Sequence, residues 1–371
     1  MSAETKNMTK VIFILPALTG GGAERVLITL MNALDRSKYE PVFITISDDG
    51  PMKEIIHPDI PFHSLHGKRT SRSLLKLYTK LKKLKPDIVV STMAHMNFCT
   101  LLLKPFFPKT RFIVREAITP SFFLTTPSMK STIIKEGYKR LYPHADCVIS
   151  PAQVIIDEFQ DVLGMACKNH ALLRNPLDLS RIRKEENTSF KITNERNNTL
   201  HFIAAGRLHS QKGFDRLISI LPQINSPYDW ELTILGEGSE RQALENLIEK
   251  HGLQNKIKLS GFSTHPWPHY AAADCFLMPS RWEGLPNAAL EALACGTPVI
   301  ATRESGGIEE IMECASEGAV TVVNDMKSFL KAMERHKPNP TEKFRPSLLP
   351  KDFSEEAVMA QFSNILDSSL A

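Results

Sequence analysis

The sequence lacks any apolar stretch long enough to cross a membrane. Hydrophobic residues make up 42% of its 371 positions. The longest apolar runs, such as residues 11–15 and 101–103, fall far short of the about 20 residues that a spanning helix needs. Residues 1–10 are polar and lack the apolar core of a secretory signal. We therefore expect a cytoplasmic protein without a membrane-spanning helix.

Signatures of structural metal sites and disulfides are also missing. The six cysteines are scattered along the chain, and none stands in a Cys-x-x-Cys pair. The sequence therefore predicts neither a zinc site nor a disulfide framework, and reduced thiols are the simplest interpretation.

The net charge is only +4, but it is distributed unevenly. Residues 1–173 carry 23 Lys and Arg against 15 Asp and Glu, a net charge of +8, and the remainder carries −4. Much of the excess lies in residues 68–85, where leucines at helical spacing alternate with lysines. This segment is interpreted either as a basic amphipathic helix that docks on anionic lipid headgroups or as a solvated surface helix. A nucleic-acid partner is not expected, because the stretch has one aromatic residue and no recognised binding motif.

Short apolar segments alternate with helical patterns along both halves of the chain. Fully apolar strands joined by helices are typical of a parallel sheet covered on both faces. The predicted fold class is therefore α/β, with doubly wound parallel sheets whose ligands lie beyond the carboxyl ends of the strands. The predicted strands are residues 11–15, 41–46, 87–91, 111–115, 147–150, 200–204, 231–235, 257–259, 275–278, 299–301 and 319–323.

The alternation breaks near Asn175 and Pro176, and residues 181–199 are polar and charged. A chain of this length exceeds one ordinary core, so we place a domain boundary and linker here. The first domain is predicted to span residues 1–173 and the second residues 174–350. Residues 351–371 form a terminal segment that looks helical.

The most informative run is residues 283–291, Glu-Gly-Leu-Pro-Asn-Ala-Ala-Leu-Glu. Pro286 is predicted at the first position of a helix, where its missing N–H costs nothing, and Gly296 is predicted to end that helix. A helix N-terminus attracts phosphate. Glu283 stands at that end, and Glu291 lies roughly 12 Å farther along the axis. Two acceptors around a phosphate-binding helix end suit a nucleotide-sugar.

Further short blocks occur in a fixed order around this run. They are residues 205–208 with 212–214, 235–238, 259–262, 280–287, 294–301 and 305–308, and near the N-terminus residues 20–25. Together they resemble the large family of retaining glycosyltransferases often called family 4. The resemblance implies the GT-B architecture, in which two Rossmann-like domains face each other across a cleft and a terminal helix crosses back to the first domain.

The resemblance implies a donor site in the second domain. Glu283 is expected to bind the transferred sugar and Glu291 the ribose. Departure of a nucleoside diphosphate needs fixed positive groups, and Arg207 with Lys212 would supply them. No Asp-x-Asp motif stands where a divalent ion would be needed, so we predict no metal and no cofactor apart from the nucleotide-sugar itself. Other donor contacts are expected at Gly236, Glu237, Phe262, Gly284, Leu285, Pro286 and Asn287.

Phe262 has two interpretations. By resemblance it lies near the base of the nucleoside, but it is equally interpreted as a core aromatic side chain.

The glycines of residues 20–25 follow a predicted strand and open a helix. Glycine at Gly21 and Gly22 lets the backbone approach a ligand closely, and the resemblance implies contact with the donor phosphate. Arg25 stands where a dinucleotide-binding fingerprint has its third glycine, which argues against a dehydrogenase. The alternative is a tight structural turn.

The acceptor side is less defined. Many relatives carry a Glu-His pair after the strand that corresponds to residues 111–115, whereas this chain has Glu116 followed by Ala117. Glu116 is a candidate for orienting an acceptor hydroxyl. His95, in the loop after residues 87–91, is a candidate substitute for the missing histidine, and an ordinary surface histidine is the alternative.

The sequence as a whole predicts a retaining glycosyltransferase. It would move a hexose or N-acetylhexosamine from a nucleotide-sugar, UDP-linked by preference, to a lipid-linked glycan at the inner face of the cytoplasmic membrane. The basic first domain fits contact with an anionic membrane surface. Two alternatives stay open, a non-catalytic module that binds nucleotide-sugars and an epimerase or phosphorylase of the same fold.

Overall fold

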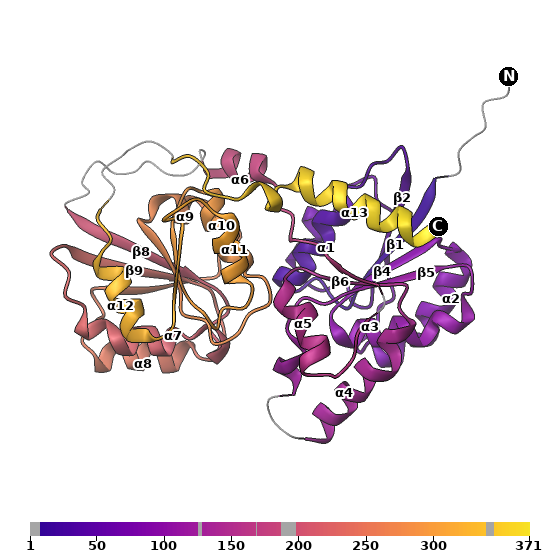
Figure 1. Cartoon of the computed structure of the whole chain (residues 1–371), viewed down its shortest axis with the longest axis horizontal. Helices are drawn as coiled ribbons and strands as arrows, with labels where there is room; N and C mark the ends of the chain where they lie inside the picture. Colours follow the sequence, from indigo (N-terminus) through magenta and orange to yellow (C-terminus); the bar gives the residue numbers. More distant parts are fainter. Residues whose placement is uncertain (1–7, 125–127, 168, 187–197, 339–344) are drawn as a thin grey trace. The chain divides into compact units, whose positions relative to one another are not determined.

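The computed structural model describes residues 8–124, 128–167, 169–186, 198–338 and 345–371. The chain divides into two compact units (Figure 1). Unit 1 comprises Met1–Pro176 and Glu355–Ala371, and unit 2 comprises Leu177–Ser354. The last helix of the chain thus belongs to the same unit as the first strand.

Unit 1 is built on a seven-stranded sheet with the order β3-β2-β1-β4-β5-β6-β7, and all its strand pairs are parallel. β1, β4, β5 and β6 are almost fully buried, as expected for apolar strands covered on both faces. The strands are β1 Thr9–Leu15, β2 Tyr39–Thr45, β3 Phe62–Ser64, β4 Ile88–Thr92, β5 Arg111–Arg115, β6 Cys147–Ser150 and β7 His170–Leu172.

Helices cover both faces of this sheet. The α-helices of unit 1 are α1 Gly22–Asn32, α2 Leu74–Leu84, α3 Ala94–Leu103, α4 Met129–Leu141, α5 Gln153–Asp161 and α13 Glu355–Leu370, and the short 3₁₀ helices are Pro51–Ile55, Ser71–Ser73, Lys104–Phe106, Pro120–Phe123 and Tyr142–His144. α13, yellow in Figure 1, shares one hydrophobic core with β1 and α1. Phe362 packs on Phe13, with ring centroids 6.3 Å apart. The Tyr39 hydroxyl donates to an Asp367 carboxylate oxygen at 2.6 Å.

Unit 2 is built on a six-stranded parallel sheet with the order β10-β9-β8-β11-β12-β13. The strands are β8 Thr199–Ala205, β9 Asp229–Leu235, β10 Ile257–Gly261, β11 Cys275–Met278, β12 Val299–Thr302 and β13 Val320–Val323. The sequence runs outward from β8 to β10 and then returns to β11 on the other side of β8. The order therefore reverses between β8 and β11, which is where ligands bind in open α/β sheets.

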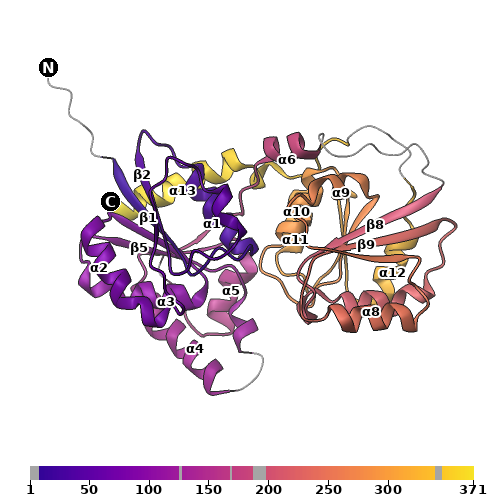
Figure 2. The same ribbon diagram turned by 180° about the vertical axis from the view of Figure 1, so that it is seen from behind.

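Figure 2 shows α8 and α12 on one face of this sheet and α9, α10 and α11 on the other. The first face carries the main core of unit 2, to which α7, α8 and α12 contribute apolar side chains. The helices are α6 Leu179–Glu186, α7 Phe214–Ile220, α8 Arg241–Lys250, α9 Trp267–Ala272, α10 Asn287–Ala294, α11 Ile308–Cys314 and α12 Met326–Glu334, with 3₁₀ helices at Ser210–Lys212, Leu221–Gln223 and Lys351–Phe353.

The predicted class, two doubly wound parallel-sheet domains, is confirmed. Each predicted strand coincides with an observed one to within two residues at either end. The sequence did not predict the edge strands β3 and β7, which have three residues each and are only half-buried. Such short segments carry too little periodicity to distinguish them from loops.

Two local predictions are wrong. Pro286 is not the first helical residue but the residue before it, with an extended backbone at ψ 97°, and α10 begins at Asn287. The polar segment at 181–199 is not entirely a linker, because α6 occupies Leu179–Glu186. α6 packs on α9 and α10 with Ile182 buried. Residues 187–197 lie outside the described part of the chain.

The basic segment at 68–85 is helical over α2, Leu74–Leu84. Leu77 and Leu81 are buried, whereas Leu75 on the opposite side is 73% exposed. Lys82 is already engaged, because it donates to the Phe106 carbonyl at 2.6 Å. In the described parts of the chain, no helix is both long and apolar enough to span a bilayer.

Candidate functional site

The loops that follow β8 and β11 meet at the reversal point of the unit 2 sheet. β8 leads into residues 206–213, and β11 leads into residues 279–286. The Arg281 N–H donates to the Gln211 carbonyl at 2.8 Å, which bonds the two loops directly. The motif residues Lys212 and Glu283 stand on these two loops.

Lys212 and Glu283, far apart in sequence, form an ion pair with Nζ and Oε1 2.6 Å apart. The side chains are 19% and 10% exposed. The Ser280 hydroxyl donates to the same Oε1 at 3.0 Å, and Gln211 Nε2 approaches Oε2 at 3.5 Å. The carboxylate is therefore fixed in direction, and the lysine, which has three N–H donors, retains capacity for a second anion.

Glycines allow the approach of the two side chains. Gly206 follows β8 with φ +152°, and a Cβ atom there would lie 2.7 Å from Lys212 Cε. The lysine stem thus occupies the space that any larger residue would need. Gly306, after β12, has φ +64°, a left-handed conformation that glycine adopts at no steric cost. A Cβ atom there would collide with the carbonyls of Glu283 and Gly284. The 305–307 loop therefore packs on the Glu283 backbone.

The other predicted donor residues lie around this pair. Arg207 is exposed at the end of β8. Glu291 is half-buried in the second turn of α10, and Asn287 is its first residue and also half-buried. Gly284 is buried and its carbonyl accepts from the Gly307 N–H at 2.7 Å. The side chains of Leu285 and Pro286 are buried, so these two residues offer a ligand mainly their backbone.

A second group of predicted residues lies at the ends of β9 and β10. Gly236 donates its N–H to the Gly261 carbonyl at 2.7 Å. Glu237 accepts two hydrogen bonds from Arg241, at 2.8 and 2.9 Å. Phe262, directly after Gly261, is 58% exposed. The interpretation of Phe262 as a core aromatic is therefore wrong, and its ring face is open to a stacking partner.

The glycine run of unit 1 is held by the carboxylate of Glu24, a residue for which the sequence predicted no role. Glu24 is buried and accepts from the Gly21 N–H at 2.5 Å and from the Thr19 hydroxyl at 2.9 Å. Gly21 is the residue before α1, and its N–H is already used inside the protein because it donates to Glu24. Gly22, the first residue of α1, is exposed. The run follows β1 at the point where the unit 1 sheet reverses, between β1 and β4.

Glu116 is fully buried at the end of β5. Its carboxylate accepts from the Asn97 amide at 3.0 Å, from the Tyr138 hydroxyl at 3.3 Å and from the Tyr142 hydroxyl. Burial raises the pKa of Glu116 to about 7, although these hydrogen bonds and the neighbouring Arg115 lower it. The carboxylate thus binds together α3, α4 and the 3₁₀ helix that begins at Tyr142, and its direct contact with an acceptor stays a prediction.

His95 is exposed at the second position of α3, after β4. The residue that caps this helix, Met93, has φ +74° and ψ 125°, a conformation that non-glycine residues rarely adopt. Strain of this kind concentrates at functional sites. His95 and the glycine run follow the two strands at which the unit 1 sheet reverses, whereas Glu116 follows the next strand, β5, and is buried.

Metal-ligating side chains do not gather in the described parts of either unit. Among the described residues, no group of three or more His, Cys, Asp and Glu is arranged to hold a metal ion. Independence from a metal stays a prediction.

Two arginines that the sequence did not single out for a role surround the Glu283 loop. Arg281 forms a bidentate pair with Asp215 at 2.6 and 2.7 Å, which lowers the pKa of Asp215. Arg216 binds backbone carbonyls of the same loop. Arg281 lies inside the motif block at 280–287, whereas Arg216 lies just beyond the block at 212–214 and has no other signal in the sequence.

Comparison with known families covers most of the chain. Residues 185–355 match the family described as "Glycosyl transferases group 1". Residues 20–181 match the family described as "Glycosyltransferase Family 4".

Among curated relatives, the chain is similar to an N-acetylgalactosamine-N,N'-diacetylbacillosaminyl-diphospho-undecaprenol 4-alpha-N-acetylgalactosaminyltransferase of Campylobacter jejuni. The two are 27% identical over 338 residues, which cover 88% of this chain and 90% of that protein. The chain is also 25% identical to the lipopolysaccharide core biosynthesis glycosyltransferase LpsE of Rhizobium meliloti, over 85% of each chain.

Among solved structures, the fold is similar to that of HepE from Anabaena, crystallised with UDP and glucose. The TM-score is 0.74 at 19% identity, covering 97% of this chain and 100% of that chain. The lipopolysaccharide outer core galactosyltransferase WaaB, in its apo form, gives a TM-score of 0.69 at 17% identity over 98% and 100% of the two chains.

Proposed function

The chain belongs to the glycosyltransferases, and on this premise we propose that it moves a hexose or N-acetylhexosamine from a UDP-sugar to a lipid-linked glycan with retention of configuration. The observation that carries the proposal is the Lys212–Glu283 pair, with Nζ and Oε1 2.6 Å apart at the reversal point of the unit 2 sheet. A cation beside a fixed hydrogen-bond acceptor matches the two parts of a sugar diphosphate, the anionic diphosphate and the hydroxyl groups of the sugar.

The chemistry of the transfer assigns a role to each group. As the sugar–phosphate bond breaks, negative charge grows on the departing diphosphate, and a fixed cation stabilises it most. Lys212 acts there as a point charge, and the exposed Arg207 offers a planar guanidinium that binds phosphate in bidentate fashion. Glu283 accepts hydrogen bonds from hydroxyls of the transferred sugar, and Glu291 from the ribose. The leaving diphosphate accepts the proton of the acceptor hydroxyl.

The UDP assignment is supported by the HepE crystal structure, which contains UDP, and by the exposed ring of Phe262. Aromatic rings and bases stack favourably. Glu237 and Arg241, which lie beside Gly261, present polar groups for the edge of the base.

The acceptor assignment is supported by the name of the Campylobacter relative, whose substrate is a diphospho-undecaprenol glycan. The net charge of +8 over residues 1–173 would attract both a diphosphate and an anionic membrane surface. Unit 1 would therefore bind the acceptor at the inner face of the cytoplasmic membrane, with Glu116 and His95 at the acceptor side.

Release of nucleoside diphosphate tests the proposal. The protein is incubated with a panel of UDP-, GDP- and ADP-sugars, with and without an extract of polyprenyl-diphosphate glycans. We expect release from one UDP-sugar only when the extract is present. Donor binding without release across the panel and a range of acceptors would indicate a non-catalytic module, and the absence of any donor binding would overturn the proposal.

Two substitutions assign the release to the site. Lys212→Met removes the cation and Glu283→Gln removes the charge without changing the shape of the side chain, and each should lower the rate by about 100-fold or more. The matched control is Lys331→Met, an exposed lysine on α12, which should leave the rate unchanged. Near-normal rates in Lys212→Met or Glu283→Gln would contradict the assignment.

A further inference from the structure

We propose that Arg216 is a positioning residue of the transferase, which fixes the loop at 279–283 and thereby the direction of the Glu283 carboxylate. The inference rests on the proposed function, because it concerns how the donor sugar is held. Arg216 lies in α7, and its guanidinium is bound to groups of the protein itself.

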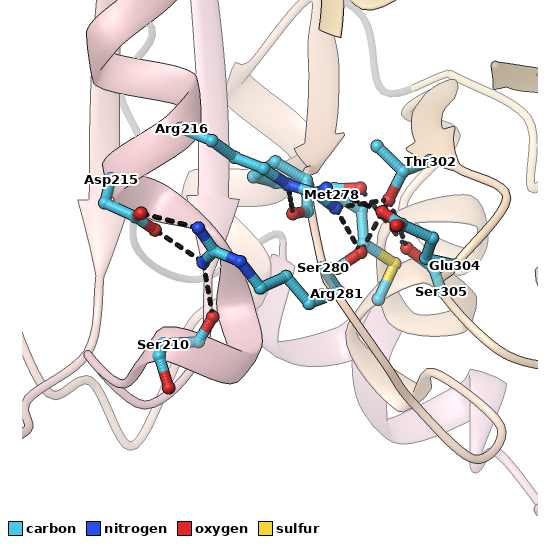
Figure 3. Close-up of polar contacts among 10 residues, drawn as sticks. Ser210, Asp215, Arg216, Met278, Ser280, Arg281, Thr302, Glu304 and Ser305 are labelled. Carbon is cyan, nitrogen blue, oxygen red and sulfur yellow. Dashed lines mark hydrogen bonds and ion pairs between the residues drawn. The ribbon is translucent and has the colours of Figure 1, made fainter. Parts of the chain in front are cut away.

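All three guanidinium nitrogens of Arg216 are engaged (Figure 3). Nε donates to the Pro279 carbonyl at 2.7 Å, and Nη2 donates to the Ser280 carbonyl at 2.5 Å. Nη1 pairs with Glu304 at 2.6 Å. The side chain is only 19% exposed, whereas Glu304 is 54% exposed. The two carbonyl contacts are therefore more shielded from solvent than the contact with Glu304. They reach consecutive peptides of the loop at 279–283.

A second group holds the same peptide from the other side. The Thr302 hydroxyl, at the end of β12, donates to the Ser280 carbonyl at 2.7 Å. Arg216 Nη2 also lies 3.1 Å from this hydroxyl oxygen. The Ser280 carbonyl thus accepts two hydrogen bonds, one from α7 and one from β12. A loop residue bonded to two separate elements has little freedom to rotate.

The constraint passes directly to Glu283. The hydroxyl of Ser280 donates to Glu283 Oε1 at 3.0 Å, so the backbone that Arg216 holds also carries a hydrogen-bond donor for the catalytic carboxylate. Gly213 packs closely against the loop at 279–283, because a Cβ atom at Gly213 would collide with the Pro279 carbonyl. We infer that loss of Arg216 lets the loop at 279–283 shift and misaligns Glu283.

Lysine cannot replace the arginine in this role. A lysine ammonium is a single point donor, whereas the guanidinium presents donors in a rigid planar fork. The two carbonyls belong to neighbouring peptides and are reached by different nitrogens of one fork. Arg216→Lys would retain charge toward Glu304 but would lose the fixed spacing between the two carbonyl contacts.

A positioning role predicts that substitution of Arg216 changes the affinity for UDP-sugar but not the affinity for UDP. The proposed nucleoside contacts, Phe262 and Glu291, lie outside residues 279–283, whereas the proposed sugar contact, Glu283, lies within them. Arg216→Ala should therefore bind UDP with wild-type affinity to within about twofold. It should bind the UDP-sugar at least tenfold more weakly and turn over about 100-fold more slowly, since small misplacements of catalytic groups have effects of that size. A general loss of folding would lower both affinities in parallel.

The experiment measures the dissociation constants of UDP and of the accepted UDP-sugar by calorimetry, together with kcat and KM. The variants are Arg216→Ala, Arg216→Lys and the control Arg303→Ala, and circular dichroism confirms that each is folded. Arg303 is 61% exposed and pairs only with Glu309 in the described structure, so its removal should change nothing. Arg216→Lys should behave like Arg216→Ala. Equal weakening of UDP and UDP-sugar, or wild-type turnover in either Arg216 variant, would overturn the inference.

A double variant shows whether Arg216 acts through Glu283. In a Glu283→Ala background, Arg216→Ala should cause no further loss of UDP-sugar affinity, because the group it positions is gone. Additive losses would refute the proposed route. If the wild-type protein binds no nucleotide-sugar at all, the proposed function fails. If it is active and Arg216→Ala is equally active, only the inference about Arg216 fails.

Discussion

The buried carboxyl group of Glu116 should make the stability of unit 1 depend on pH. Burial raises its pKa to about 7, from an ordinary value of 4.5. The folded chain therefore binds a proton that the unfolded chain releases between these two pH values. Stability that this proton contributes is fully present below pH 4.5 and is lost as the pH rises through about 7.

The magnitude follows from the difference in proton affinity. Each tenfold difference corresponds to about 1.4 kcal/mol, so the full effect of Glu116 is about 3 kcal/mol. Between pH 5.5 and pH 8 the expected fall from Glu116 alone is about 2 kcal/mol. The histidines also titrate in this range, but their contribution is common to the wild type and a Glu116 variant and cancels in the comparison. Glu116→Gln mimics the protonated side chain at every pH, so this part of the pH dependence should vanish.

The assay is urea unfolding of the wild type and of Glu116→Gln at both pH values. Circular dichroism reports on both units, whereas tryptophan fluorescence reports on unit 2, because Trp230, Trp267 and Trp282 all lie there. The difference in unfolding free energy between variant and wild type should be about 2 kcal/mol more favourable to the variant at pH 8 than at pH 5.5. It should appear in the circular dichroism transition but not in the tryptophan fluorescence transition, which reports on unit 2. An identical difference at the two pH values would falsify the raised pKa.

Three further outcomes are expected. Tyr142→Phe removes a hydrogen bond that lowers the pKa of Glu116, so the pH at which unit 1 loses stability should move upward; an unchanged midpoint in the same unfolding titration would contradict this. Gly206→Ala displaces the aliphatic chain of Lys212 and should abolish diphosphate release, while the melting temperature of unit 2 falls only slightly. Retained release would show that the Lys212 side chain has room to move. Charge reversal at the exposed residues Arg72 and Lys83 should weaken co-sedimentation with phosphatidylglycerol vesicles by about tenfold or more, because each basic residue near the membrane surface contributes roughly 1 kcal/mol. Charge reversal at Lys331 of unit 2 is the control. Equal effects in unit 1 and unit 2 would refute docking through unit 1.

The sequence alone determined the class of fold and the segments that carry the candidate donor residues. Apolar runs such as residues 11–15 and 275–278 predict strands because fully buried parallel strands need no polar positions. The run at 283–291 marks a loop, a helix start and two acidic side chains without reference to the rest of the chain. These are local properties, because hydrophobicity and backbone preference belong to each residue and its neighbours in sequence.

Only the tertiary structure decided which side chains meet. Lys212 and Glu283 come together because β8 and β11 are neighbours in the sheet, and strand order is not encoded in the periodicity of either strand. Glu116 proved to be buried because tyrosines of α4 and of the following 3₁₀ helix close over the end of β5. Arg216 gained a role because its fork spans two carbonyls of a loop from a different strand. Such pairings depend on the packing of segments distant in sequence, so the properties of the individual residues do not determine them.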